Sequence, residues 1–449
     1  MDKKRIIDIA KLVVPSTAGV LLFLVPVSYG ESQEMLSGII VSWLKSSLEG
    51  VSVPLLVCMV SASAVLSLWH RISPIPFISR HDGLDAIFSP SRFWIAVRVG
   101  GAAMMLAVFL GIGPAELVSE GTGGNMLHTV APTCAAWYLI GGVFLPLLTD
   151  YGFVDLFASL LRGVAQPLFR IPGRSVANCL SSWFGSSVCG TYLTISQYEK
   201  GFYTGREAAT IISCFSILSI SFCSMIASIL GLGRHFIAFY GTIAITGLIL
   251  ALLLPRIWPI RSMTSDYCDD VGKKIDEEAP ENVGRLAWGC RQALARAASA
   301  PGLGTALSRG LTSALNMTVS TLPSIMVFGT VALMVATYTD LFAYLGAPLG
   351  AYLSLFGIPD AMEVGSIVLV GFADQFVPVI LGAAQASVEV RFLVGTLCIL
   401  QVLYMTDIGA LILTSKIPFS FPQLFVVYLE RVLISVPMVL ALGHLFGVL

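Results

Sequence analysis

Charged residues are scarce in this chain of 449 residues: Asp, Glu, Lys and Arg together make up 12% of it, whereas soluble domains contain roughly 25%. Hydrophobic residues make up 56% of the chain, and its mean hydropathy is +0.85. A water-soluble surface needs more polar side chains than this composition supplies. The chain is therefore predicted to be an integral membrane protein.

Short segments of alternating polarity, which would indicate a membrane β-barrel, are also missing. The apolar residues instead form blocks of about 18–25 residues, the length that a helix needs to cross a bilayer core of about 30 Å. We expect an all-α polytopic fold. Its spanning helices are predicted at 9–28, 51–70, 93–112, 130–149, 207–231, 235–256, 311–337, 389–413 and 421–446.

Motifs of catalysis and of ATP use are absent from the sequence. There is no H-E-x-x-H, no G-x-S-x-G with a partner His and no Walker loop. The nine cysteines form no C-x-x-C pair, and most lie in apolar blocks, which disfavours metal and disulfide roles. We expect no enzyme, no bound cofactor and no nucleic-acid partner.

Lys and Arg are distributed unevenly around the predicted spans. The start of the chain and the stretch 71–92 are basic, which by the positive-inside rule places them in the cytoplasm. The polar segment 257–310 is interpreted as a cytoplasmic linker, and Arg98 is expected to snorkel to the cytoplasmic interface. The predicted location is the inner membrane of a bacterial cell, with a cytoplasmic N-terminus.

The two halves of the chain repeat one plan. In 153–170, apolar residues recur at helical spacing with arginines between them, which is typical of an interfacial helix, and a polar stretch follows at 174–200. The same order recurs at 339–357 and 360–386. The matching residues include DLFA at 155–158 and at 340–343, Phe184 and Phe372, and Glu207 and Glu389.

Charge predicts that these repeats are inverted. Lys and Arg flank the polar stretch of the first half, whereas none occurs between Arg309 and Arg391. The first polar stretch is therefore expected to enter from the cytoplasm and the second from outside. The expected domains are scaffold helices at 1–128, a first repeat at 129–256, the linker at 257–310 and a second, inverted repeat at 311–449.

Inverted repeats with broken segments at matching positions are typical of secondary transporters, whose substrates bind where half-helices meet. A carboxylate at membrane depth is costly unless it is paired, hydrated or protonated. This marks Asp374 and Asp407 for cation coupling, with Na⁺ near Asp374, or for binding a substrate amine or hydroxyl. The candidates around the breaks are Asn178, Ser186, Ser187, Thr191, Glu363, Asp374 and Gln375.

Simpler roles are open for several of these residues. A Ser or Thr in a membrane helix often only bonds the preceding turn or a neighbouring helix. Glu207 and Glu389 lie near predicted helix N-termini and are expected to complement the helix dipole. Glu363 fits a solvated position at the outer mouth as well as it fits a binding role.

The stretch from about 135 to 256, with IPGRSVANCLSSWFGSSVCGTYL followed by YTGREAATIISCFSI, resembles a Gate domain, also called a nucleoside-recognition domain. The whole chain is similar to the YjiH-like Gate-domain membrane proteins. The stretch IPDAMEVGSIVLVGFADQFVPVIL resembles a second Gate unit. More distantly, concentrative nucleoside transporters contain such units as two re-entrant hairpins of opposite topology, each followed by a partly unwound helix.

This resemblance implies that the hairpin tips hold a solute and a sodium ion. It assigns Ser186, Ser187 and Thr191 to the first hairpin, Asp374 and Gln375 to the second, Ser216 and Ser219 to the first following helix, and Gln401 and Asp407 to the second.

The expected function is secondary active transport of a small polar solute, such as a nucleoside, an amino acid or a peptide, driven by Na⁺ or H⁺ through an elevator-type mechanism in a homodimer. The alternative is a Gate-domain scaffold or receptor that transports nothing.

Overall fold

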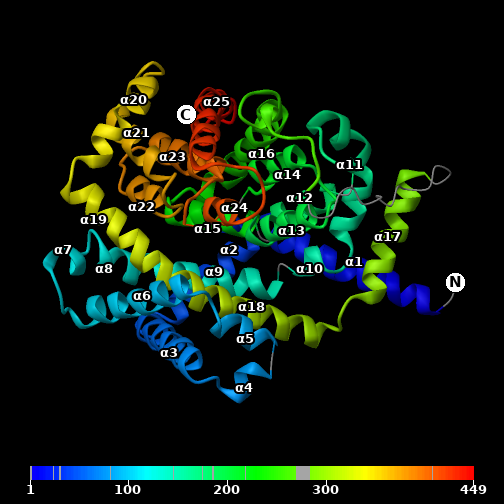
Figure 1. Ribbon diagram of the computed structural model, residues 1–449, viewed down its shortest axis with the longest axis horizontal. Coiled ribbons are helices and arrows are strands. Elements are labelled where there is room, and N and C mark those ends of the chain that lie inside the picture. Colours follow the sequence, from blue (N-terminus) through cyan, green and yellow to red (C-terminus); the bar gives the residue numbers. More distant parts are fainter. Residues whose placement is uncertain are drawn as a thin grey trace. The chain divides into compact units, whose positions relative to one another are not determined.

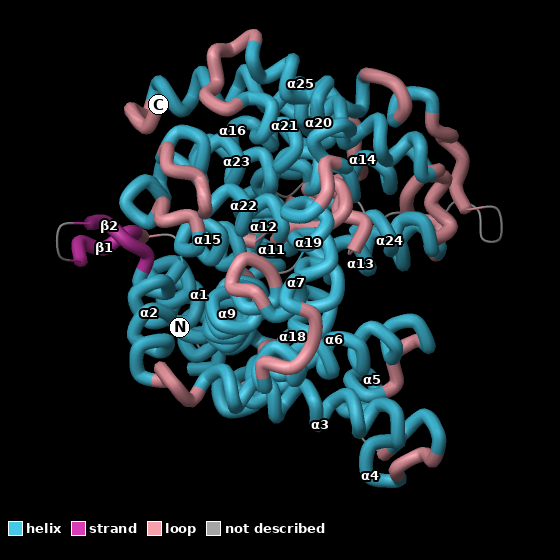
Figure 2. The backbone as a smooth tube through the Cα atoms, turned by 90° about the vertical axis from the view of Figure 1, so that its left-hand side faces the viewer, coloured by secondary structure: helices cyan, strands magenta, loops and turns pink. Residues whose placement is uncertain are grey.

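The computed structural model describes residues 3–23, 25–29, 32–80, 82–144, 146–173, 175–184, 187–217, 219–268, 284–406 and 408–449. Helices dominate these ranges; a short antiparallel hairpin of β1 (Pro26–Tyr29) and β2 (Ser32–Met35) follows the first helix (Figure 2). Within the same ranges, eight helices are long and apolar enough to cross a bilayer. The chain is an all-α multi-pass membrane protein, as its composition predicts.

The chain divides into two compact units, and each is described by itself. Unit 1 comprises Met1–Leu36, Leu145–Gly302 and Pro348–Leu449, and unit 2 comprises Ser37–Phe144 and Leu303–Ala347. The predicted repeat boundaries do not coincide with these limits, and the division into repeats stays a prediction.

Unit 2 is a bundle around one long helix, α18 (Leu303–Ser324). Three helices pack against α18: α3 (Ser52–Ile72), α6 (Arg92–Leu110) and α9 (Ala131–Phe144). A Cβ placed on Gly310 of α18 would lie 2.6 Å from the carbonyl oxygen of Gly142 in α9. Glycine is therefore needed for this close helix crossing. The other elements are α2 (Leu36–Ser47), α4 (Pro76–Ser79), α5 (Asp82–Phe88), α7 (Ala115–Val118), α8 (Gly123–Asn125), α19 (Thr330–Tyr338) and π-helical turns at Met126–Val130 and Ile325–Gly329.

Arg98 is buried in unit 2, with 5% of its surface exposed. Its Nη1 donates to the hydroxyl of Ser67 and to the carbonyl of Ile87, each at 2.8 Å, and its Nη2 donates to the hydroxyl of Ser320 at 3.0 Å. The expectation that Arg98 snorkels to the interface is wrong. Neighbouring helices supply enough acceptors to hold the guanidinium inside the protein.

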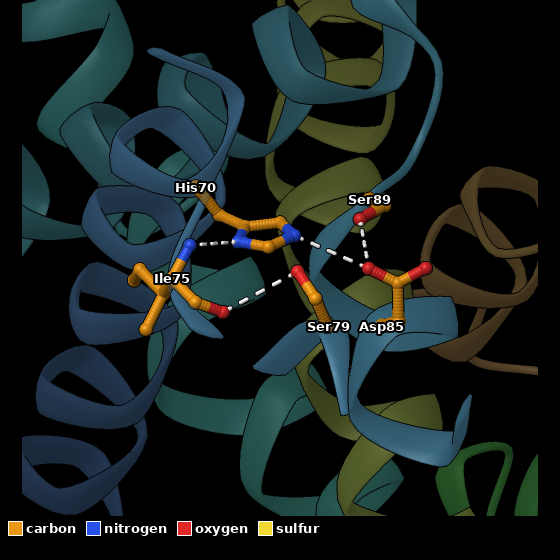
Figure 3. Close-up of polar contacts among 5 residues, drawn as sticks. All are labelled: His70, Ile75, Ser79, Asp85 and Ser89. Carbon is orange, nitrogen blue, oxygen red and sulfur yellow. Dashed lines mark hydrogen bonds and ion pairs between the residues drawn. The ribbon is translucent and has the colours of Figure 1, made fainter. Parts of the chain in front are cut away.

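A second polar cluster lies where α3 ends (Figure 3). The backbone N–H of Ile75 donates to Nδ1 of His70 at 2.9 Å, while Nε2 of His70 lies 3.2 Å from Oδ1 of Asp85. Because Nδ1 accepts, the proton of a neutral ring is on Nε2, which donates to Asp85. Ser89 donates to the same carboxylate oxygen at 2.8 Å. These bonds fix the connection between α3 and α6.

One order of elements occurs twice in the chain, and its helices are labelled in Figure 1; all of it lies in unit 1 except Leu341–Ala347, the first part of α20, which belong to unit 2. A helix, a pair of short helices, an interrupted helix and a long helix occur twice in this order. In the first set they are α11 (Phe153–Phe169), α12 (Ser175–Phe184) with α13 (Ser187–Glu199), α14 (Gly205–Phe215) with α15 (Ile220–Ile229), and α16 (Phe236–Leu253). In the second they are α20 (Leu341–Ser354), α21 (Ala361–Val370) with α22 (Val377–Ala383), α23 (Val388–Gln401) with α24 (Ile408–Thr414), and α25 (Phe421–Leu445).

The two sets pack together inside unit 1. Helix α13 contacts α24, α15 contacts α22, and α16 contacts both α23 and α25. In the window Gly205–Ile229, 94% is buried, against 22–47% in the other seven candidate spans. The interrupted helix α14–α15 therefore lies at the centre of this unit, surrounded by protein.

The remaining elements of unit 1 are α1 (Lys3–Phe23), α10 (Pro146–Thr149), α17 (Arg285–Ser299) and 3₁₀ turns at Gly233–His235, Leu254–Arg256 and Ile260–Ser262. Helix α17 packs against α11 and α1. It lies within the predicted polar linker 257–310, of which 269–283 falls outside the described residues. The segment predicted as a polar linker thus contains a packed helix, in which Gly289, Ala293 and Ala297 are buried at helical spacing.

Candidate functional site

Side-chain caps begin three of the four helices that make up the two interrupted helices: α14, α15 and α23. Thr204 and Glu207 form a capping box at the start of α14, as the position of Glu207 predicts. After the break, the hydroxyl of Ser219 accepts from the backbone N–H of Phe222 at 3.4 Å and begins α15. In the second set, Ser387 caps α23, with Glu389 in its first turn. Ser219 thus has a structural role at the helix start.

The second break begins with a strained residue. Val402 is fully buried and has φ +61° and ψ −39°, a conformation that is a genuine outlier for a β-branched side chain. The carbonyls of Gln401 and Val402 accept from the residues two positions further on, at 2.6 and 3.1 Å, which makes two successive three-residue turns. Such strain costs about 1–3 kcal/mol and concentrates at functional sites.

The first hairpin, α12 with α13, is joined internally and to the first break. Nδ2 of Asn178 donates to Oγ1 of Thr194 at 2.6 Å, which links the two helices. Thr191 donates to the carbonyl of Ser187 at 2.9 Å, and its hydroxyl lies 3.1 Å from that of Ser216, the residue that ends α14. The amide oxygen Oδ1 of Asn178 is buried and has no partner. Ser186 lies outside the described residues.

The second hairpin, α21 with α22, is joined to the second break in a corresponding way. Oδ1 of Asp374 accepts from the backbone N–H groups of Phe376 and Val377, at 2.7 and 3.1 Å, and so caps α22. Its Oδ2 accepts from the hydroxyl of Thr406 at 3.1 Å. Thr406 also donates its backbone N–H to the carbonyl of Ala373, at 3.2 Å. Both oxygens of the Asp374 carboxylate are thus engaged at the hairpin tip.

Two glutamines beside this tip keep a free acceptor. Nε2 of Gln401 donates to the carbonyl of Val368 in α21 at 3.0 Å, but its Oε1 is buried without a partner. Oε1 of Gln375 is also buried and unpartnered, while the backbone carbonyl of Gln375 accepts from Sγ of Cys398 at 3.0 Å. Asp407 lies outside the described residues. Together with Asn178, the structure thus gives three predicted site residues a buried, unpaired amide oxygen.

Glu363 lies apart from this buried group. Its side chain is exposed on the first turn of α21, and its Oε1 accepts from Nε2 of Gln385 at 2.6 Å. This position corresponds to the solvated alternative that the sequence left open.

Sequence reasoning missed Arg431, which is completely buried in α25. Its Nε donates to the carbonyl of Leu400, and its Nη1 donates to the carbonyl of Ser213. These two carbonyls lie in the last turns of α23 and α14, immediately before the two breaks, where helix carbonyls lose their intrahelical partners. The signal available in the sequence was a lone arginine ten residues into an apolar 25-residue helix.

The unpartnered acceptors among these predicted site residues are neutral amide oxygens. Among the described residues, no three His, Cys, Asp or Glu side chains come together as a metal site. Unpaired amide oxygens can accept hydrogen bonds from a solute or contribute to the coordination of a hard cation.

Comparison with known proteins places the chain in a family. A family model described as Gate, nucleoside recognition, matches residues 133–233. A protein of Alkalihalophilus pseudofirmus, described as uncharacterised, is 36% identical over 436 residues, which cover 97% of this chain and 94% of that protein. The chain belongs to the Gate-domain family. A structure of CNTnw in an intermediate state also aligns with the Gate-domain chain, at 13% identity, with a TM-score of 0.40 and coverage of 100% and 99% of the two chains.

The match locates the Gate segment on the first half of the site. Residues 133–233 contain the first hairpin and the whole of the interrupted helix α14–α15. The second hairpin and break of this Gate-domain protein lie beyond the matched range. Their correspondence to the first set rests on the order of elements and on the bonds that join each hairpin to the break after it.

Proposed function

We propose that this Gate-domain protein is a secondary active transporter of a small polar solute. The proposal is carried by one observation: each hairpin is bonded to the break of the helix that follows it, and the amide oxygens of Asn178, Gln375 and Gln401 are left buried without a partner there. An unpaired buried acceptor costs about 1–3 kcal/mol. A bound solute with N–H or O–H donors would recover this free energy.

The division into units supports an elevator-type mechanism. Both hairpins and both interrupted helices belong to unit 1, whereas unit 2 contains long helices that pack closely through glycine. In the proposed mechanism unit 1 carries the solute and unit 2 is the scaffold, which in a homodimer would also hold the two copies together. The Gate description makes nucleosides one class to test, beside amino acids and peptides.

A Na⁺ or H⁺ gradient would supply the driving force, and Asp374 is the residue proposed to respond to it. Its carboxylate is buried, with 5% of the residue exposed. A Na⁺ ion near Asp374 would compete with Thr406 for Oδ2. Coupling would then loosen the bond between the second hairpin and the second break.

The experiment is uptake into proteoliposomes under imposed Na⁺ or H⁺ gradients, with a panel of nucleosides, amino acids, dipeptides and organic acids. Gln375→Ala is expected to lower uptake about tenfold, the effect of one lost hydrogen bond of about 1.4 kcal/mol. Gln385→Ala is the matched control, because it removes an amide just after the same hairpin that bonds the exposed Glu363 and not the buried group. If no solute is taken up, the transporter proposal fails, and a solute that only raises Tm would favour a receptor.

A further inference from the structure

Arg431 forms hydrogen bonds with both repeated sets of helices. Through Nε it bonds the end of α23, and through Nη1 it bonds the end of α14. A guanidinium has five N–H groups, and these two bonds use two of them, which leaves three. Nη2 is buried and has no hydrogen-bond partner.

The charge of Arg431 is not balanced by a carboxylate in the described part of the chain. The ion pair found there joins His70 and Asp85, in unit 2. Each helix C-terminus contributes about half a negative charge, so the ends of α14 and α23 hold the cation in place. These helix ends do not bond the remaining N–H groups of Arg431, and a buried N–H group without an acceptor costs free energy.

Arg98 is also buried, and its hydrogen bonds can be compared with those of Arg431. It also lies in a membrane helix, and no carboxylate among the described residues pairs with it either. Its Nη1 and Nη2 nitrogens, however, both donate to the acceptors around them. The unpartnered Nη2 of Arg431 therefore distinguishes it from Arg98, whose Nη2 donates to Ser320.

The surroundings of Arg431 place it beside the candidate solute site. Tyr428, one turn earlier on α25, donates to the carbonyl of Val368, and Gln401 donates to this same carbonyl. Ser435, one turn later, has a buried hydroxyl without a partner. Unsatisfied groups of Arg431, Ser435 and Gln401 thus gather around the second break and the last helix.

We propose that Arg431 recognises an oxyanion of the substrate, a carboxylate or a phosphate. This inference rests on the proposed transport function and narrows its substrate class to anionic or zwitterionic solutes. The planar fork of a guanidinium matches a carboxylate or phosphate with two parallel hydrogen bonds, and the free N–H groups of Arg431 are already oriented by its two carbonyl bonds. A neutral solute would leave the charge uncompensated.

The test uses matched pairs of solutes on the purified full-length protein. The members of each pair differ in one ionised group: a dipeptide and its C-terminal amide, N-acetylglycine and its amide, uridine and uridine monophosphate. Binding is measured as the shift of Tm with concentration, and transport as uptake into liposomes. At least one anionic member is expected to bind about 10- to 100-fold more tightly than its neutral partner, the range of a charge-assisted hydrogen bond. A preference in the first two pairs indicates that Arg431 recognises a carboxylate, and a preference in the third pair indicates a phosphate.

Variants then assign the preference to Arg431. Arg431→Lys keeps the charge and removes the fork, and it is expected to weaken binding of the anion about tenfold or more while a neutral partner binds as before. Arg98→Lys, the matched control, is expected to lower Tm and to keep the anion preference. An Arg431→Lys protein that folds and keeps the full preference overturns the assignment.

If the variants do not fold, the solute pairs measured on the wild-type protein still test the inference. If neutral members bind or are transported as well as their anionic partners, the inference about Arg431 is overturned and the transport function stands. If no solute of either kind is bound or transported, the proposed function fails, and the inference fails with it.

Discussion

Gln401 and Gly371 meet where the second hairpin touches the end of α23: a Cβ on Gly371 would overlap the side-chain amide oxygen of Gln401. The amide cannot simply turn away, because its Nε2 is bonded to the carbonyl of Val368 in the same hairpin. The absence of a side chain at 371 therefore sets the position of a candidate solute-binding group.

We expect Gly371→Ala to destabilise the protein by about 1–3 kcal/mol through overpacking and to lower solute binding by displacing the Gln401 amide. Gly241→Ala is the control in the same unit, since its Cβ would lie 3.5 Å from the ring of Phe446, an ordinary contact. Thermal unfolding in detergent measures both. A second substitution, Gln401→Ala, should recover stability in the Gly371→Ala background, and additive effects would contradict the contact.

Backbone strain at Val402 predicts which of two substitutions there leaves the protein more stable. Both Val402→Ala and Val402→Gly remove the buried side chain, but only glycine adopts a positive φ without steric cost. We expect Val402→Gly to be more stable than Val402→Ala by about 1–3 kcal/mol. At an ordinary buried helical position such as Leu397 in α23, the same pair should rank in the opposite order. Equal Tm values for the two variants at 402 would argue against the strained turn.

Much of the site follows from the sequence because its local signals are strong. Clusters of Gly, Ser and Pro within apolar surroundings predict a break in each polar stretch, and the structure has helix pairs at 175–199 and 361–383. The interruptions after α14 and α23 were implied by the family resemblance alone. The predicted span 389–413 is divided into two shorter helices, because Gln401 ends α23 and α24 starts at Ile408. The first helix also ends earlier than expected, at Phe23, and β1 (Pro26–Tyr29) takes the place of the end of the predicted span 9–28.

Buried arginines could not be placed from the sequence in the same way. Whether a membrane arginine snorkels or is buried depends on acceptors from other helices, and Arg98 and Arg431 find theirs at Ser320 and at Ser213, both more than 200 residues away in the chain. The sequence also could not predict which amide oxygens lack a hydrogen-bond partner, because this depends on the neighbours that pack around each side chain.

Asp374 is expected to act through the hairpin tip. Asp374→Ala removes the acceptor of two backbone N–H groups and of the Thr406 hydroxyl and should destabilise by about 1–3 kcal/mol. Asp374→Asn keeps one oxygen for the backbone groups and should retain most of the stability. If Asp374 also couples transport to Na⁺, Asp374→Asn folds but loses the dependence of uptake on Na⁺. Unchanged Na⁺ dependence would leave Asp374 with a capping role alone.

The cluster around His70 predicts a loss of local stability in acid. Hydrogen bonds from Ser89 and His70 lower the pKa of Asp85 below its usual value. A depressed pKa means that the carboxylate contributes stability above its unfolded pKa, and this contribution is lost as the pH falls below about 4. Pepsin cleavage in 73–91 should therefore accelerate at acid pH more in the wild type than in Asp85→Asn, which cannot titrate. The same acid response in both proteins would exclude Asp85 as its cause.

The inverted orientation of the two sets can be tested at matched loops. Lys200 and Ala386 are exposed and lie in the connections that precede α14 and α23. The charge distribution predicts the first in the cytoplasm and the second outside. Single cysteines at these positions, in a background that lacks the exposed Cys58 and Cys290, should react with a membrane-impermeant maleimide from opposite sides of the membrane. Labelling of both from one side would contradict the inverted repeat, because the two hairpins would then not enter the membrane from opposite faces.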